Sequence, residues 1–190
     1  MTKIALKKFS LVLTMAMIGL VCAGGGVLTN AWAGTGQEID ANCDGALKFF
    51  FDEVKGSEGL AKNAKGVLIF PKVLKAGIGI GGEYGEGALR IKGKTVDYYN
   101  TAAASLGFQL GAQKKTIVIL FMQQEALDRF RASSGWKAGV DASIAVVTLG
   151  AGGAMDTAKL KEPILGFIIG QKGLMYNLTL EGAKFTKLKK

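Results

Sequence analysis

Apolar residues recur at three- and four-residue spacing through residues 37–54, which predicts one amphipathic helix near the start of the folded region. Its polar side carries Asp40, Asp44, Lys48 and Asp52. A second, shorter helix is predicted over 58–65, with Ser57 as its N-cap. A third is predicted over 123–132, because Leu127 and Phe130 fall on one side and charged residues on the other.

The remaining apolar patterns are typical of strands. The runs 67–70, 117–121 and 164–169 contain no polar residue, which predicts strands buried on both faces. Residues 88–91 and 95–99 flank a Gly-containing turn at 92–94 and predict a hairpin. Further strands are expected over 105–110, 116–122, 138–149, 164–170, 173–180 and 184–188.

Glycine and proline content sharpens this interpretation. The chain has 28 glycines and only two prolines, and many of the glycines fall within the predicted strands and turns. Glycine lets a sheet bend sharply, as small barrels require. We therefore expect an α+β fold: a strongly curved, glycine-rich, mostly antiparallel, barrel-like sheet with an N-terminal amphipathic helix and two shorter helices.

The first 33 residues have the pattern of an export signal. Three lysines precede an apolar stretch over 9–21, and Ala31-Trp32-Ala33 matches an A-x-A cleavage site. This predicts a signal peptide over 1–33, a single domain over 34–190, and a location in the periplasm or outer envelope. Cleavage after Ala23 and acylation of Cys22, as in a lipoprotein, stay open as alternatives.

Charge and composition narrow the function classes. The net charge is +9, of which the three lysines of the signal account for three, leaving +6 for the domain. A basic surplus favours anionic partners, and export disfavours nucleic acid among them. The chain has no histidine, which removes Ser-His-Asp and Cys-His catalysis and His-ligated zinc. We expect a protein that is not an enzyme and needs no metal or cofactor.

A formal dinucleotide-binding fingerprint, G-x-G-x-x-G, is present at Gly77, Gly79 and Gly82, with Asp97 twenty positions after the first glycine. That motif binds a pyrophosphate only where a strand leads into the first glycine and a helix starts at the last. Two more glycines follow within five residues of Gly82 and disfavour a helix. The pattern instead predicts a strand that is bent or closely approached by another backbone. Glu83 and Glu86 are expected on its opposite faces, too far apart to act as a catalytic pair.

Several motifs resemble one known family in order and spacing. They are Lys65-Gly66-Val67-Leu68-Ile69-Phe70-Pro71, Lys75-Ala76-Gly77, Gly82-Glu83-Tyr84-Gly85-Glu86-Gly87, Gly135-Trp136, Gly139-Val140-Asp141 and the segment 173–182. Together they are similar to the SYLF domain over about residues 37–188. The resemblance implies a lipid-binding module, because eukaryotic members bind phosphoinositides and membranes and some also bind actin.

The resemblance places membrane contact in the N-terminal amphipathic region and nearby basic residues. On this sequence the region corresponds to Phe49, Phe50 and Phe51 and to Lys62, Lys65, Lys72 and Lys75. We therefore expect a non-enzymatic protein of the bacterial envelope that binds anionic phospholipid membranes. The alternative is a structural or interaction protein, either an oligomeric surface antigen or an actin-binding type of module. Export from a bacterial cell disfavours actin, and homo-oligomerisation stays open.

Overall fold

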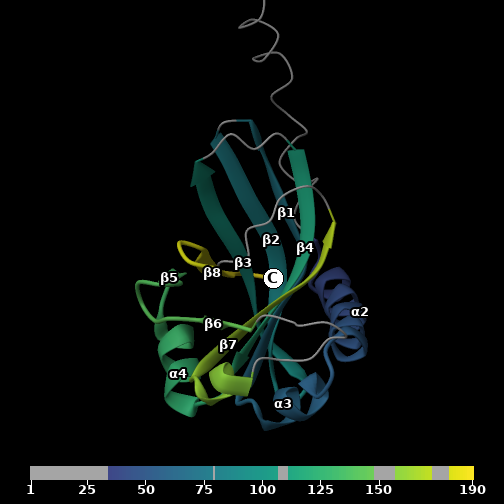
Figure 1. The fold of residues 1–190 in the computed structure, drawn as a ribbon, viewed down its shortest axis with the longest axis vertical. Coiled ribbons are helices and arrows are strands. Elements are labelled where there is room, and N and C mark those ends of the chain that lie inside the picture. The colour runs from purple at the N-terminus through teal and green to yellow at the C-terminus, as the bar shows by residue number, and fades with distance from the viewer. Residues whose placement is uncertain (1–33, 79, 107–110, 148–156, 173–179) are drawn as a thin grey trace, which may run out of the picture. The chain divides into compact units, whose positions relative to one another are not determined.

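The computed structural model describes residues 34–78, 80–106, 111–147, 157–172 and 180–190. Within these residues it contains one eight-stranded sheet, three α-helices and one 3-10 helix (Figure 1). The predicted signal peptide, Cys22 and the alternative cleavage sites lie outside the described residues, so processing and export stay predictions.

The helices lie close to the predicted ranges. They are α2 (Gly36–Glu53), α3 (Ser57–Asn63), α4 (Gln124–Ala132) and the 3-10 helix η2 (Thr157–Lys161). The strands are β1 (Gly66–Ile78), β2 (Ile80–Ile91), β3 (Lys94–Leu106), β4 (Gly111–Phe121), β5 (Trp136–Lys137), β6 (Ala145–Val146), β7 (Ile164–Lys172) and β8 (Lys184–Leu188).

The strands form a strongly curled half-barrel in the order β5-β8-β3-β2-β1-β4-β7-β6. All described neighbours pair antiparallel except β6 and β7, which pair parallel. The predicted α+β class and the curved, mostly antiparallel sheet are therefore confirmed. The three uninterrupted apolar runs are the neighbouring strands β1, β4 and β7, which carry core side chains on both faces.

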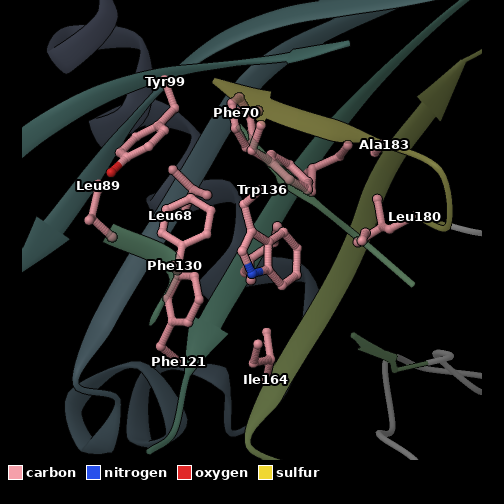
Figure 2. Close-up of a cluster of buried hydrophobic side chains, with 14 of the residues drawn as sticks. Leu68, Phe70, Leu89, Tyr99, Phe121, Phe130, Trp136, Ile164, Leu180 and Ala183 are labelled. Carbon is pink, nitrogen blue, oxygen red and sulfur yellow. The ribbon is translucent and has the colours of Figure 1, made fainter. Parts of the chain in front are cut away.

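Each face of the sheet has its own apolar cluster. On the face covered by α2, called here the α2 face, the helix packs Ile39, Cys43 and Phe50 against strand residues that include Ile69 and Phe167. On the opposite, α4 face, Phe130 lies at the centre of an aromatic cluster (Figure 2). Its ring centroid is 4.9 Å from those of Tyr99 and Phe121 and 5.6 Å from that of Trp136; Phe185 also belongs to the cluster.

A capping box fixes the start of α2. The Thr35 hydroxyl accepts a hydrogen bond from the Glu38 backbone N–H at 3.2 Å, and the Glu38 carboxylate accepts one from the Thr35 N–H at 2.8 Å. These two bonds satisfy donors that the first helical turn leaves unpaired. The bonds from Thr35 also lower the pKa of Glu38. The capping box can be recognised in the sequence Thr35-Gly36-Gln37-Glu38, but the apolar periodicity that predicted this helix does not include it.

Two details of the predicted secondary structure are wrong. Ser57 is not the N-cap of α3: Gly56 holds that position with φ +82°, and the Ser57 hydroxyl donates to the Phe50 carbonyl. The strand predicted over 138–149 is mostly a loop within its described part, 138–147. Gly139 has φ +82°, and the Lys137 carbonyl accepts from the Asp141 N–H at 2.9 Å, which closes a turn. The predicted strand 173–180 falls mainly outside the described residues, as do 107–110.

The glycine fingerprint lies in the β1–β2 hairpin. Gly77 pairs with Gly81, Ile78 pairs with Ile80, and β2 then continues as a strand through Gly82. The expected hairpin of 88–91 with 95–99 is also present, with Lys92 and Gly93 in its turn at φ 52° and 76°. Positive φ at both turn residues is typical of tight hairpins.

Close backbone approach occurs farther along β2 than the fingerprint. A Cβ on Gly87 would overlap the Ile69 carbonyl oxygen and lie 2.7 Å from the Phe70 ring, whereas one on Gly82 would meet nothing within 4 Å. Gly85 is equally restricted, because its Cβ would lie 2.8 Å from the Lys72 carbonyl oxygen. Both contacts flank the register shift of β1 after Ile69. The prediction of close approach thus holds for this strand, but not at Gly82.

Candidate functional site

A groove of about 400 Å³ lies beside α2 and α3, where the end of β2 turns into β3. Its volume falls within the usual range of about 300–1,000 Å³ for small-molecule sites. The lining residues come from α2, α3 and its C-cap, the start of β1, the end of β2 and the β2–β3 turn: Leu47, Phe51, Glu58, Ala61, Lys62, Ala64, Val67, Arg90, Lys92 and Gly93.

The groove wall is apolar. Leu47 and Phe51 lie at the edge of the apolar stripe of α2, and Val67 is the second residue of β1. All three are partly exposed, because the fully buried positions of the stripe, such as Phe50, face the sheet. Leu47, Phe51 and Val67 therefore cover the core from outside and leave apolar surface open toward the groove.

Cations stand at the rim. Lys62 is exposed and pairs with Glu58 at 2.9 Å, with 74% and 61% of the two side chains accessible. An exposed ion pair of this kind contributes little to stability, so Lys62 can exchange Glu58 for another anion at low cost. Lys92 is exposed in the β2–β3 turn. A ligand in the groove would thus meet two accessible ammonium groups above an apolar wall.

Arg90 lines the groove but is committed to the fold. Its guanidinium lies 2.6 Å from the Asp44 carboxylate and donates to the Asp40 carbonyl at 3.1 Å. The Arg90 Nε is buried and has no hydrogen-bond partner in the described part of the chain. The two terminal nitrogens of the guanidinium therefore hold α2, whereas the Nε–H has no hydrogen-bond partner among the described residues.

Asp40 completes the attachment of α2 to the sheet. Its carboxylate accepts hydrogen bonds from Thr95 at 2.7 Å and from the Tyr98 hydroxyl at 2.9 Å. Because the Tyr98 hydroxyl donates to this carboxylate, the pKa of Tyr98 is raised. Polar residues on the sheet side of α2 thus position the groove wall.

The three predicted phenylalanines point in different directions. Phe50 is fully buried, with its ring centroid 4.9 Å from that of Phe167. Phe51 lines the groove. Phe49 is 38% exposed and lies over Gly170, where an added Cβ would be 2.9 Å from its ring. Only Phe49 and Phe51 can offer apolar surface to a ligand while α2 stays packed on the sheet.

The four predicted lysines do not share one surface. Lys62 lines the groove, and Lys65 is exposed where the chain enters β1. Lys72 is exposed seven residues farther along β1, roughly 20 Å away at the usual rise of a strand. Lys75 is only 7% exposed. The structure thus brings together Lys62, Phe51 and two residues that the sequence reasoning missed, Arg90 and Lys92.

Other kinds of site are not evident within the described residues. No three His, Cys, Asp or Glu side chains gather there to hold a metal ion. None of the helices in that part of the chain is long and apolar enough to cross a membrane. Cys43 is buried against Ile69, and burial raises the pKa of its thiol to about 12.

Comparison with known families gives a match over part of the chain. The family model described as Ysc84, Las17-binding protein actin regulator, matches residues 102–190. A search of curated proteins found no match. The matched segment includes the Gly135-Trp136 and Gly139-Val140-Asp141 motifs, whereas every residue that lines the groove precedes it. Residues 102–190 are therefore similar to the Ysc84, or SYLF, family, which agrees with the resemblance stated from the sequence motifs.

Proposed function

We propose that this protein is a non-enzymatic lipid-binding protein that holds anionic phospholipid at the groove beside α2 and α3. The observation that carries the proposal is the pairing of an apolar wall with accessible cations at its rim. An anionic headgroup would pair with Lys62 and Lys92, while the first carbons of the acyl chain would lie against Leu47, Phe51 and Val67.

The expected binding energies of such an arrangement are sufficient for weak attachment to a membrane. Each lysine near an anionic surface contributes about 1 kcal/mol, and each buried methylene about 0.8 kcal/mol. Two lysines and a few methylenes give weak, reversible and salt-sensitive binding. The groove is too small for an entire two-chain lipid to be enclosed, so we propose contact with a lipid that stays in its bilayer.

The membrane in question is the bacterial envelope. This part of the proposal is supported by the pattern of residues 1–33, which is typical of an export signal and would place the domain in the periplasm or outer envelope. N-terminal sequencing of the protein from its own envelope would test it. An N-terminus at Gly34 supports the proposal, and a retained Met1 in cytosolic protein contradicts it.

Vesicle sedimentation tests the binding itself. The full chain should bind phosphatidylglycerol vesicles more strongly than phosphatidylcholine vesicles, and less at high salt. The double variant Lys62→Glu with Lys92→Glu should reduce binding to the anionic vesicles by about tenfold or more, since charge reversal removes attraction and adds repulsion.

One charge-matched control variant locates the site. Lys72→Glu with Lys137→Glu changes two exposed lysines away from the groove and alters the net charge equally. This control should retain most of the binding. An equal loss in both double variants would mean that net charge alone drives binding, and the groove would be rejected as the site.

A protein partner is the second candidate, favoured by the family match. The family is described by its binding of Las17 and regulation of actin, and the matched residues run from the end of β3 through β4, α4 and β7 to β8. We propose this role only as a protein-interaction surface, which includes a second copy of the chain. It predicts concentration-dependent assembly by light scattering that persists in detergent and is unaffected by Lys62→Glu. A monomer at all concentrations would contradict self-assembly.

A further inference from the structure

A second group of charged side chains lies on the α4 face of the sheet, away from the groove. Two neighbouring rows of register partners cross β4, β1, β2 and β3. The first row is Lys115, Val73, Gly85 and Thr101. The second row is Gln113, Lys75, Glu83 and Ala103. Val73, from the first row, and Ala103, from the second, belong to the apolar cluster on this face. Because register partners lie on the same face, the side chains of both rows point to the α4 face.

The polar members of these rows are buried. We call Lys75, Glu83, Thr101, Gln113 and Lys115 the inner polar cluster. The whole-residue exposure is 7% for Lys75, 3% for Gln113 and Lys115, and zero for Thr101; the Glu83 side chain is 10% exposed. Such burial is unusual for lysine, whose ammonium is costly to remove from water without a partner.

The charges of the cluster do not balance. The Lys115 ammonium lies 2.9 Å from the Glu83 carboxylate, which forms one buried ion pair. Lys75 is the direct register neighbour of both Glu83 and Gln113, but forms no ion pair or hydrogen bond of its own among the described residues. Among the described residues of this cluster, two lysines face one glutamate, which leaves one positive charge there without a counterion.

An unused hydroxyl lies on the adjacent row. The Thr101 Oγ1 is buried and has no hydrogen-bond partner within the described part of the chain. Its register partner Gly85 has no side chain, so nothing on β2 stands between Thr101 and the row that contains Lys75. A free ammonium and a free hydroxyl on one face are two donors that an oxygen-rich anion can satisfy.

We propose that the inner polar cluster binds a phosphodiester-type oxyanion, with Lys75 as the ion-pairing residue and Thr101 as a hydrogen-bond donor. A phosphodiester carries one negative charge, which matches the one uncompensated positive charge. The Glu83–Lys115 pair orients the site and disfavours more highly charged anions through the repulsion of its carboxylate. This site goes beyond the groove, because it lies on the other face and shares no residue with it.

Dimethyl phosphate is a suitable soluble probe, and the line width of its ³¹P signal reports binding. The full chain should broaden this signal at constant ionic strength. Lys75→Met keeps the apolar stem and removes the charge, and should weaken binding by about tenfold or more. Lys72→Met removes an exposed charge three residues away and should leave binding unchanged.

A second variant guards against loss of the fold. Thr101→Val keeps the side-chain shape, and should weaken binding by about fivefold through loss of one donor. Binding of dimethyl phosphate that is equal in the wild-type, Lys75→Met and Thr101→Val proteins would overturn the proposal. No detectable binding by the wild-type protein to either dimethyl phosphate or phosphatidylglycerol vesicles would overturn it as well.

Two further measurements separate this site from the groove and identify the source of the anion. The groove variant Lys62→Glu with Lys92→Glu should bind dimethyl phosphate normally; if it does not, the signal belongs to the groove and the inner site is rejected. Displacement of dimethyl phosphate by phosphatidylglycerol vesicles, but not by phosphatidylcholine vesicles, supports a lipid headgroup as occupant. Retention in the presence of both supports a soluble phosphodiester.

Discussion

The Arg90 guanidinium on β2 lies 2.6 Å from the Asp44 carboxylate on α2, and this ion pair is one of the contacts that attach the groove wall to the sheet. The Arg90 side chain is 12% exposed, so the pair is shielded on one side, whereas the carboxylate is open to water. The same guanidinium reaches the Asp40 carbonyl. Arg90 therefore contributes both to the lining of the groove and to the attachment of α2.

Replacement of Arg90 should destabilise the fold. Arg90→Leu removes the ion pair and the bond to Asp40, and should lower the free energy of unfolding by about 1–3 kcal/mol. Urea denaturation measures this value. Lys62→Ala, which breaks the exposed pair with Glu58, should cost at most about 0.5 kcal/mol. Equal costs for the two variants would contradict the role assigned to Arg90.

The phenylalanines of α2 should separate stability from binding. Phe50→Ala removes a fully buried ring and should cost about 3–5 kcal/mol of stability. Phe49→Ala, at a 38% exposed position, should cost much less. Phe51→Ala should mainly weaken vesicle binding. The comparison needs thermal unfolding and vesicle sedimentation on all three variants, and a Phe51→Ala protein that binds normally would count against the groove.

Glycine substitutions should differ sharply within β2. Gly87→Ala places a methyl group against the Ile69 carbonyl and the Phe70 ring, so it should destabilise the fold by about 1–3 kcal/mol or more. Gly82→Ala meets open space and should change stability by less than about 1 kcal/mol, in either direction. Chemical denaturation of both proteins checks the contrast; a tolerated Gly87→Ala would mean that the strands separate at low cost.

Stability should fall in strongly alkaline solution. Burial raises the pKa of the Cys43 thiol from 9.0 to about 12 and that of the Tyr99 hydroxyl from 10.0 to about 12. Between these values the unfolded chain loses protons that the folded chain retains. Each group therefore favours unfolding by about 1.4 kcal/mol per pH unit, from pH 9 for Cys43 and from pH 10 for Tyr99, up to about pH 12.

Two variants isolate these contributions. Cys43→Ala should remove the decline that begins near pH 9. Tyr99→Phe removes a buried hydroxyl with no hydrogen-bond partner among the described residues, so it should be neutral or stabilising at pH 7 and should reduce the decline above pH 10. Unfolding curves in urea from pH 7 to 12 give the slopes. A slope unchanged in both variants would contradict the assignment.

Most elements of the fold could be predicted from local sequence patterns. The α2 periodicity, the three apolar runs and the Lys92-Gly93 turn depend on neighbours in sequence, and each was predicted close to its position. The loop at 138–142 was not, because alternating apolar residues there satisfy the strand pattern while Gly139 adopts a positive φ that only the folded turn reveals. Strand order between distant segments, such as β8 beside β3, has no local signal at all.

The candidate site was predicted less well for a geometric reason. Lys62, Lys65, Lys72 and Lys75 are close in sequence, but an extended strand carries them apart and turns Lys75 to the opposite face from Lys72. Conversely, Lys92 is thirty residues from Lys62 and reaches the same groove through a hairpin. Charge density along a chain therefore indicates a surface patch only where the backbone is compact.

The glycines of the β1–β2 hairpin also have a consequence for how such sequences are classified. A search by spacing alone would group Gly77, Gly79 and Gly82 with nucleotide-binding loops, whereas the positions that cannot accept a side chain are Gly85 and Gly87, two residues apart. A spacing of two residues is that of side chains on one face of a strand, so it indicates a strand tightly paired with its neighbour. Tolerance to alanine at each glycine would therefore distinguish a curved hairpin from a cofactor loop in a library of variants, before any ligand is tried.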